Sequence, residues 1–149
     1  MIRIHLGDDD FNRFGTRILK FAVPVVVNTP VVRVLGVREF RAAGSPEGSP
    51  PESRTVDVAL GTGDSVDRAF LDRVRFIDDQ LLAASDLIGA DPDRYRPLVV
   101  DTPDGATMKI KLAQGAGGAG AVDDTRSFTV RMDHVWFMGE RWGVTWRAA

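Results

Sequence analysis

Basic side chains alternate with apolar ones in several segments of this sequence, and others stand next to aromatic rings. In a strand, a cation between two apolar residues projects outward while its neighbours enter the core. The basic and aromatic residues concerned are Arg33, Arg38, Phe40, Arg94, Tyr95, Arg96, Lys109, Lys111, Arg131, Arg141 and Trp142. A groove for single-stranded nucleic acid needs this combination, because cations follow phosphates and flat rings stack on bases at roughly 1–3 kcal/mol per base. Outward cations that merely keep a β-protein soluble would give the same pattern, and both explanations stay open.

Other kinds of chemistry find little support in the residue types. The absence of cysteine excludes disulfides and thiolate metal sites. The two histidines, His5 and His134, lack the spacing of zinc ligands. There is no Gly-x-Ser-x-Gly motif, and the glycine-rich segment AQGAGGAGAVDDT lacks the Gly-Lys-Ser/Thr of a phosphate-binding loop. We therefore expect a protein that is not an enzyme and that holds no metal and no cofactor.

The charge totals decide little. The formal net charge is −2, which does not advertise nucleic-acid binding. The cations are sixteen arginines and three lysines. Arginine is the better residue for gripping phosphates and stacking on bases, but a GC-rich genome produces the same bias.

Alternating valine-rich segments predict strands at 17–27 and 31–41, separated by Asn28-Thr29-Pro30. Pro24 lies inside the first of them and predicts an edge strand or a bulge there. A third strand is expected at 54–61. These three segments would form the first half of a sheet.

A single helix is expected next, capped by Asp64 or Ser65 and ended by Gly89. Its apolar stripe consists of Val66, Phe70, Val74, Ile77 and Leu81. The segment TMKIKLA predicts a further strand, and a hairpin with the turn GER closes the chain. The order predicts a mostly β, OB-fold-like barrel of five to six strands with one helix between strands three and four. One domain would cover 1–149, with flexible loops at about 42–53 and 113–124.

The three tryptophans all belong to the closing hairpin. Trp136 shares its strand parity with Phe128, Val130 and Met132, so it is expected in the core. Trp142 follows Arg141 at the turn and is the ring expected to be exposed. The parity of Trp146 leaves its position undecided.

Five segments, taken in order, resemble the single-stranded-DNA-binding proteins of nucleocytoplasmic large DNA viruses. That family is thought to be distantly related to the podophage-type replication proteins with an OB-fold. The segments are VVVNTPVVRVLGV, AFLDRVRFIDDQLLAAS, DRYRPLV, TMKIKL and HVWFMGERWGVTWRA. The resemblance covers about residues 18–149, and the ordered set of these segments carries it.

The resemblance implies sequence-independent coating of single-stranded DNA during viral DNA replication, recombination or repair. Single-stranded RNA is the alternative ligand, and replication proteins are further partners. By position it implies that the groove contains Arg33, Tyr95, Lys109, Lys111, Arg131 and Trp142. The chain departs from the family in lacking a Trp-Phe-rich central segment, in carrying Arg147 where lysine is common, and in showing no acidic C-terminal tail. Recruitment of partners through such a tail is therefore not expected.

The alternative is a β-rich structural or assembly protein, such as a virion component. Its contacts to other protein chains would use Phe137, Trp142 and Trp146. A second copy of the chain, in a homo-oligomer, is a further partner that the sequence leaves open. The sequence shows no apolar run of membrane-spanning length and no signal-peptide pattern. We expect a soluble intracellular protein without a membrane partner and, if it is viral, one at replication sites in the host cytoplasm or nucleus.

Overall fold

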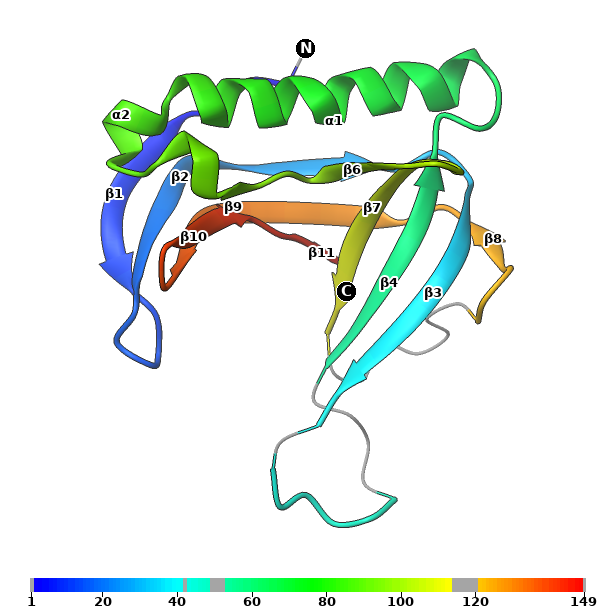
Figure 1. The fold of residues 1–149 in the computed structure, drawn as a ribbon, viewed down its shortest axis with the longest axis horizontal. Coiled ribbons are helices and arrows are strands. Elements are labelled where there is room, and N and C mark those ends of the chain that lie inside the picture. The colour runs from blue at the N-terminus through cyan, green and yellow to red at the C-terminus, as the bar shows by residue number, and fades with distance from the viewer. Residues whose placement is uncertain (1, 42, 49–52, 114–120, 149) are drawn as a thin grey trace.

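The frame of the molecule is a β-sheet bent into an arch, with one long helix across its top (Figure 1). The computed structural model describes residues 2–41, 43–48, 53–113 and 121–148. Strand makes up 50% of the structure and helix 19%, so the mostly β fold class is confirmed. The strands are β1 (Leu6–Phe11), β2 (Arg17–Asn28), β3 (Val32–Phe40), β4 (Ser53–Leu60), β5 (Tyr95–Arg96), β6 (Val99–Thr102), β7 (Gly105–Leu112), β8 (Thr125–Arg126), β9 (Thr129–Met138), β10 (Arg141–Val144) and β11 (Trp146–Ala148). The helices are α1 (Ser65–Ala83) and α2 (Ser85–Ile88), followed by a 3₁₀ turn at Pro92–Arg94.

The described strands form one open sheet. Their order is β1-β2-β9-β11-β7-β4-β3-β8, with β10 beside β9 and β5, and β6 beside β7. The short strand β11 joins the part of the sheet formed by β1, β2 and β9 to the part formed by β7, β4, β3 and β8, because it pairs antiparallel with β9 and parallel with β7. The closed OB-fold barrel stays a prediction. The helix follows the fourth strand along the chain, because β1 is a strand that the sequence pattern does not predict.

Helix α1 begins as its sequence predicts. The side chain of Asp64 accepts hydrogen bonds from the backbone N–H groups of Val66 and Asp67, both at 3.1 Å. Such a cap contributes roughly 1 kcal/mol. The helix ends at Ala83, and Gly89 ends the short α2 in a left-handed conformation with φ of 76°. Gly89 therefore ends the helical segment as predicted, although a break at Ala84 divides it in two.

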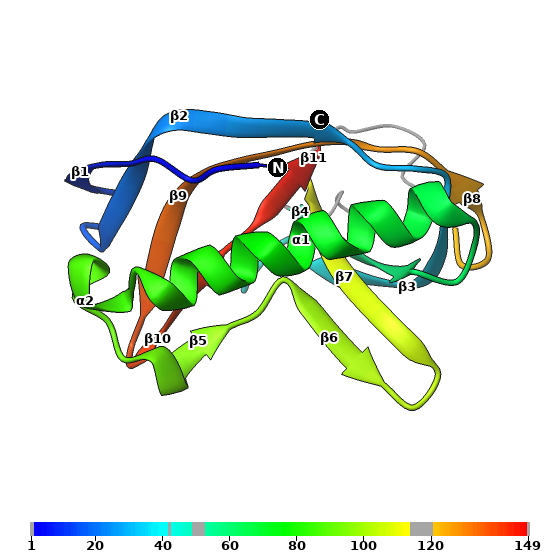
Figure 2. The same cartoon turned by 90° about the horizontal axis from the view of Figure 1, so that it is seen from above.

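The apolar stripe of α1 covers the sheet. Phe70, Val74, Ile77 and Leu81 are buried, whereas Val66, in the first turn, is exposed. Seen from above, α1 lies across the space that the strands surround (Figure 2). Burial of each such side chain contributes about 1.5–3 kcal/mol, so this face fixes the helix on the sheet. The opposite face of the sheet is left free to form a surface.

A bulge in β2 changes the parity of β9. Lys20 pairs with His134 and Val25 with Met132, so five positions on β2 run beside two on β9. Pro24 lies in this irregular stretch, as its position predicts. On β9, Met132 and Val135 are both buried although three positions separate them. The residues after the bulge therefore face opposite to what strict alternation from Val130 predicts.

Several elements go beyond the sequence expectation. The acidic stretch near the N-terminus forms β1, and the segment after the helices contributes β5 and β6, for which the sequence pattern predicts no strands. The two predicted loops fall partly on residues 42, 49–52 and 114–120, which lie outside the described residues. No helix in the described ranges is long and apolar enough to cross a membrane.

Candidate nucleic-acid interface

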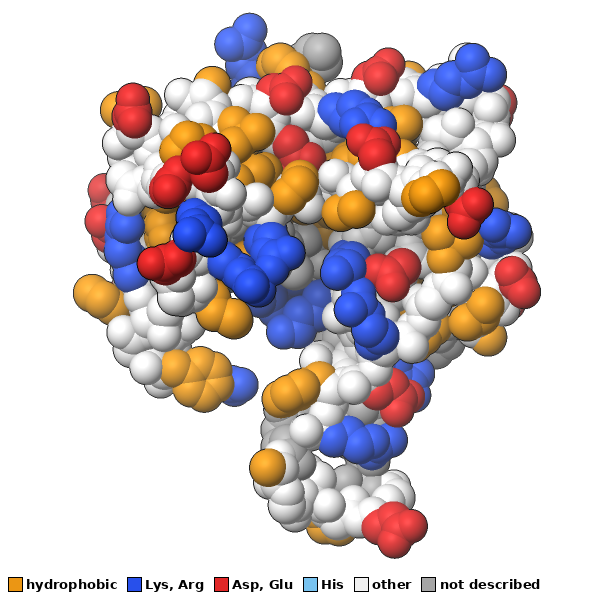
Figure 3. Space-filling model, in the orientation of Figure 1, with side chains coloured by type: hydrophobic (Ala, Val, Ile, Leu, Met, Phe, Trp, Pro, Cys, Tyr) orange, Lys and Arg blue, Asp and Glu red, His pale blue; other side chains and the backbone are white. Residues whose placement is uncertain are grey.

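A groove with a volume of about 1230 Å³ opens on the face of the sheet that turns away from the core. One wall is formed by β3, β4, β6 and β7, and the other by β5, the end of β9 and β10. Five of the predicted candidates line it, namely Arg33, Arg96, Lys109, Lys111 and Arg141. Figure 3 shows basic side chains gathered around a hollow in the middle of this face. The fold thus brings together cations from four strands that are distant in sequence.

None of these five cations forms an ion pair with a described residue. Asp57 lies opposite Lys109 in the register of β4 and β7, but its carboxylate contacts the guanidinium of Arg38 at 3.3 Å. A second carboxylate, that of Asp104, lines the groove and, unlike Asp57, has no basic partner among the described residues. The groove therefore carries more positive than negative charge.

The predicted cations that do not line the groove are neutralised locally. Arg38 pairs with Asp57, Arg94 pairs with Glu140 at 3.3 Å, and Arg131 pairs with Asp133 at 3.6 Å. All three pairs are largely exposed, so each contributes at most about 1 kcal/mol and is easily exchanged for another partner. The structure thus divides the candidates into an unpaired set in the groove and a paired set around it.

A row of cations crosses the sheet at the level of Lys111. Strand pairing places Arg38, Thr55, Lys111, Arg147 and Arg131 directly opposite one another on β3, β4, β7, β11 and β9. Strands lie about 4.8 Å apart, so the row is roughly 19 Å long. Like charges directly opposite each other are destabilising. Such a row is favourable where an anion lies across the strands.

Lys111 is the most buried cation of this row. Partial burial lowers its pKa, and the positive charges of Arg147 and Arg13 lower it further. An ammonium in this position gains more from a phosphate than one in open water, because it has already lost part of its hydration. Arg147 is missing from the set predicted by sequence, although its position between Trp146 and Ala148 shows the same alternation as the others.

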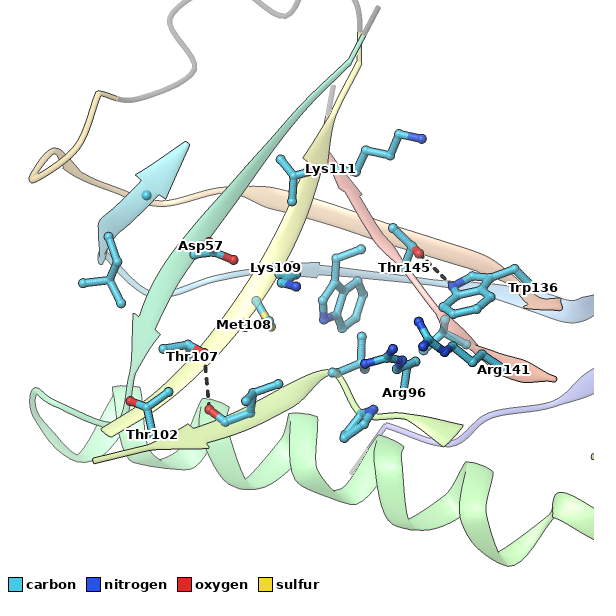
Figure 4. Close-up of a pocket in the computed structure, with 18 of the residues that line it drawn as sticks. Asp57, Arg96, Thr102, Thr107, Met108, Lys109, Lys111, Trp136, Arg141 and Thr145 are labelled. Atoms are coloured by element: carbon cyan, nitrogen blue, oxygen red, sulfur yellow. Dashed lines mark hydrogen bonds between the residues drawn. The ribbon is translucent and has the colours of Figure 1, made fainter. Parts of the chain in front are cut away.

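Trp136 is the aromatic ring of the groove, which corrects its expected place in the core. The parity change on β9 turns it to the groove side, where it is half-buried and its indole N–H donates to Oγ1 of Thr145 at 3.0 Å. Figure 4 shows its ring beside Arg96 and Arg141. Its flat face and these two guanidinium groups form the arrangement that base stacking requires.

Gly143 makes room for this arrangement. It pairs with Arg96 on one side and with Trp136 on the other. A Cβ at this position would lie 3.0 Å from the carbonyl oxygen of Arg96 and 3.1 Å from the indole ring of Trp136. A larger residue would therefore require the Arg96 backbone or the Trp136 ring to shift by a few tenths of an ångström.

Trp142 and Tyr95, both predicted for the groove, are buried instead. Trp142 is 1% exposed, and its indole N–H donates to the carbonyl oxygen of Asp91 at 2.6 Å. Tyr95 is 8% exposed, and the two ring centroids lie 4.7 Å apart. The two residues are register partners on the parallel strands β10 and β5. This pairing cannot be read from local sequence, and it removes both rings from the surface.

A buried carboxylate anchors the segment that carries Arg96. Asp78 of α1 accepts hydrogen bonds from the hydroxyl of Tyr95 at 2.5 Å and from the backbone N–H groups of Leu98 and Val99 at 2.8 and 3.2 Å. Burial raises the pKa of Asp78, and these three hydrogen bonds partly offset that effect. Burial and the nearby Asp78 likewise raise the pKa of the Tyr95 hydroxyl. These three hydrogen bonds to Asp78, called the clamp below, fix the residues on both sides of Arg96.

The remaining aromatic candidates lie outside the groove or below its surface. Phe40, at the end of β3, is 59% exposed and does not line the groove. Trp146 is fully buried. The ring of Phe137 is half-buried, and the guanidinium carbon of Arg17 lies 4.4 Å from its centroid. The prediction that Phe137, Trp142 and Trp146 form an apolar contact surface for assembly is therefore wrong.

Among the described residues no group of three or more histidine, cysteine or carboxylate side chains is placed to hold a metal ion. Comparison of the chain with protein-family models, with curated proteins and with solved structures finds no match.

Proposed function

We propose that this protein binds single-stranded DNA without sequence preference and does no chemistry on it. The observation that carries the proposal is the groove itself, which combines the half-buried ring of Trp136 with five cations that form no ion pair within the described part of the chain. A role in viral DNA replication, recombination or repair follows from the resemblance of the sequence.

The phosphates would follow the cations. The row through Lys111 and Arg147 runs across the strands, and the cluster of Arg96 and Arg141 lies at the other end of the groove. A DNA strand that runs from the row through Lys111 to the cluster of Arg96 and Arg141 would cross the β-sheet, as ligands of OB-folds do. We propose an OB-like arrangement on this ground.

Base recognition would rest on stacking. Every base has a π-face, so Trp136 accepts any of them, and the neighbouring guanidinium groups add cation–π attraction. Single-stranded RNA has the same phosphates and bases, and only contacts to its 2′-hydroxyl would separate the two ligands. We therefore propose DNA as the ligand and treat RNA as a comparison in the binding assay.

A charge-reversal experiment tests the proposal. In the first variant Lys109→Glu is combined with Arg141→Glu, and in the control Arg68→Glu is combined with Arg73→Glu on α1. Both variants change the net charge equally, and neither control arginine forms an ion pair with a described residue. Affinity for fluorescent oligo-dT is measured by anisotropy over a range of salt.

The groove variant is expected to lose about tenfold or more in affinity at low salt. Its plot of log affinity against log salt should become shallower by about 1.4, since each phosphate contact on a single strand contributes roughly −0.7. The control should keep most of the affinity. Equal losses in both variants, or no binding by the wild type at low salt, would contradict the proposal.

A second candidate function is assembly with other protein chains. It is favoured by the exposed side chains of Val23, Val26 and Val31 on and after β2, which are 60%, 55% and 68% exposed. Light scattering after size-exclusion chromatography separates the two functions. Ordered oligomers without DNA would support assembly, and a monomer that binds oligo-dT would support the first proposal.

A further inference from the structure

The turn between β1 and β2 presents aromatic and basic side chains to solvent. Phe14 is 76% exposed and Phe11 is 67% exposed. The guanidinium carbon of Arg13 lies 4.7 Å from the centroid of the Phe14 ring. Large exposed rings are uncommon on small soluble domains, and clusters of them mark contact sites.

The turn has a fixed shape. The side-chain oxygen of Asn12 accepts hydrogen bonds from the backbone N–H groups of Phe14 at 2.9 Å and Thr16 at 3.0 Å. The backbone N–H of Asn12 donates to the carbonyl oxygen of Thr16 at 2.9 Å. Gly15 takes the left-handed conformation that the turn requires, with φ of 77°. The exposed rings are thus held on a built support.

This turn faces the cationic groove. Figure 1 places the β1–β2 hairpin on the side of the arch opposite β3, β4 and β7. In Figure 3 a hydrophobic and a basic side chain at the lower end of that hairpin reach toward the open space between the two sides. The positive charge of Arg13 also acts on Lys111, which lines the groove on β7. The charges of Arg13 and Lys111 therefore act on each other across the opening.

We propose that the tip formed by Arg13 and Phe14 is a second binding element for the same strand of DNA, which receives a nucleotide as the strand leaves the groove beyond Lys111. The inference rests on the proposed function. A base would stack on the exposed face of Phe14, and the guanidinium of Arg13, already held over that ring, would contact the adjoining phosphate. An anion between Arg13 and Lys111 would also remove the repulsion between them.

The test compares two lengths of oligo-dT, of about 6 and about 20 nucleotides, because a short strand fills the groove alone and a long one reaches the tip as well. The variants are Phe14→Ala and Arg13→Ala. The matched control is Leu87→Ala, since Leu87 is 85% exposed on α2 and does not line the groove. All three side chains are exposed, so thermal unfolding should be nearly unchanged in every variant.

Phe14→Ala is expected to weaken binding of the long strand by about tenfold and to leave the short strand unchanged. Arg13→Ala should also make the salt dependence for the long strand shallower by about 0.7. A Phe14→Ala variant that behaves like Leu87→Ala on both lengths would overturn the inference, and so would an equal loss on both lengths. Either result leaves the proposed function standing if the wild type binds. Failure of the wild type to bind either length would instead remove the proposed function.

Discussion

Removing the hydroxyl group of Tyr95 should lower the stability of the fold without changing how the ring packs. In Tyr95→Phe the ring stays against Trp142, whereas the hydrogen bond of 2.5 Å to Asp78 is lost. A hydrogen bond to a charged group contributes about 1.5–3 kcal/mol, so the free energy of unfolding should fall by about 2 kcal/mol at neutral pH. The backbone N–H groups of Leu98 and Val99 still contact the carboxylate, so the protein should remain folded.

The loss should depend on pH in a defined direction. Burial raises the pKa of Asp78, so the folded state binds more protons than the unfolded state between the unfolded pKa and the folded one. The free energy of unfolding therefore falls as pH rises through that window. The Tyr95 hydroxyl lowers the pKa of Asp78 and so limits this fall. Without it the fall is larger, and the difference between wild type and Tyr95→Phe should be greater at neutral pH than at acid pH.

The assay is urea unfolding followed by tryptophan emission, at neutral pH and at about pH 4, near the ordinary pKa of aspartate. Thr102→Val is the matched control, since it removes an exposed hydroxyl that donates to the carbonyl oxygen of Gly105 at 2.8 Å. It should change the free energy of unfolding by no more than about 0.5 kcal/mol at either pH. A Tyr95→Phe variant as stable as this control, or one whose loss grows at acid pH, would refute the role given to the clamp.

Two further substitutions have effects on both stability and binding. Gly143→Ala would bring a methyl group within 3.0 Å of the Arg96 carbonyl oxygen and 3.1 Å of the Trp136 ring, so we expect a loss of about 1–3 kcal/mol in urea unfolding and weaker oligo-dT binding. Arg147→Ala removes one of three neighbouring cations, so unfolding should become less favourable by roughly 0.2–1 kcal/mol while affinity for oligo-dT falls. If Arg147→Ala destabilises the free protein, the row of cations is not under the repulsion described.

Local pattern was sufficient where a residue's surroundings are set by its own element. The cap at Asp64 and the buried stripe of α1 follow from helical spacing, and Lys109 and Lys111 face outward because they alternate with Met108, Ile110 and Leu112 on β7. The alternation of charged and apolar residues is thus sufficient to predict that Lys109 and Lys111 project from the outer face of β7, where they line the groove.

The aromatic residues were misplaced because their positions depend on distant parts of the chain. The bulge in β2 reverses the parity of β9 and turns Trp136 to the groove. Tyr95 and Trp142 bury each other through a pairing between β5 and β10 that no local period records. The row of cations at Arg147 exists only because β11 lies between β7 and β9. Strand register and long-range pairing, rather than residue type, decided these positions.

The most direct measurement for the groove is the quenching of tryptophan emission by oligo-dT at low salt, in the wild type and in Trp136→Phe. Trp142 and Trp146 are buried and remain in both proteins, so they report only indirect changes. Stacking of a base on Trp136 predicts strong quenching in the wild type that is largely lost in Trp136→Phe, while a gel shift persists because phenylalanine still stacks. Full quenching in Trp136→Phe, or unchanged emission of the wild type without a gel shift, would contradict the account.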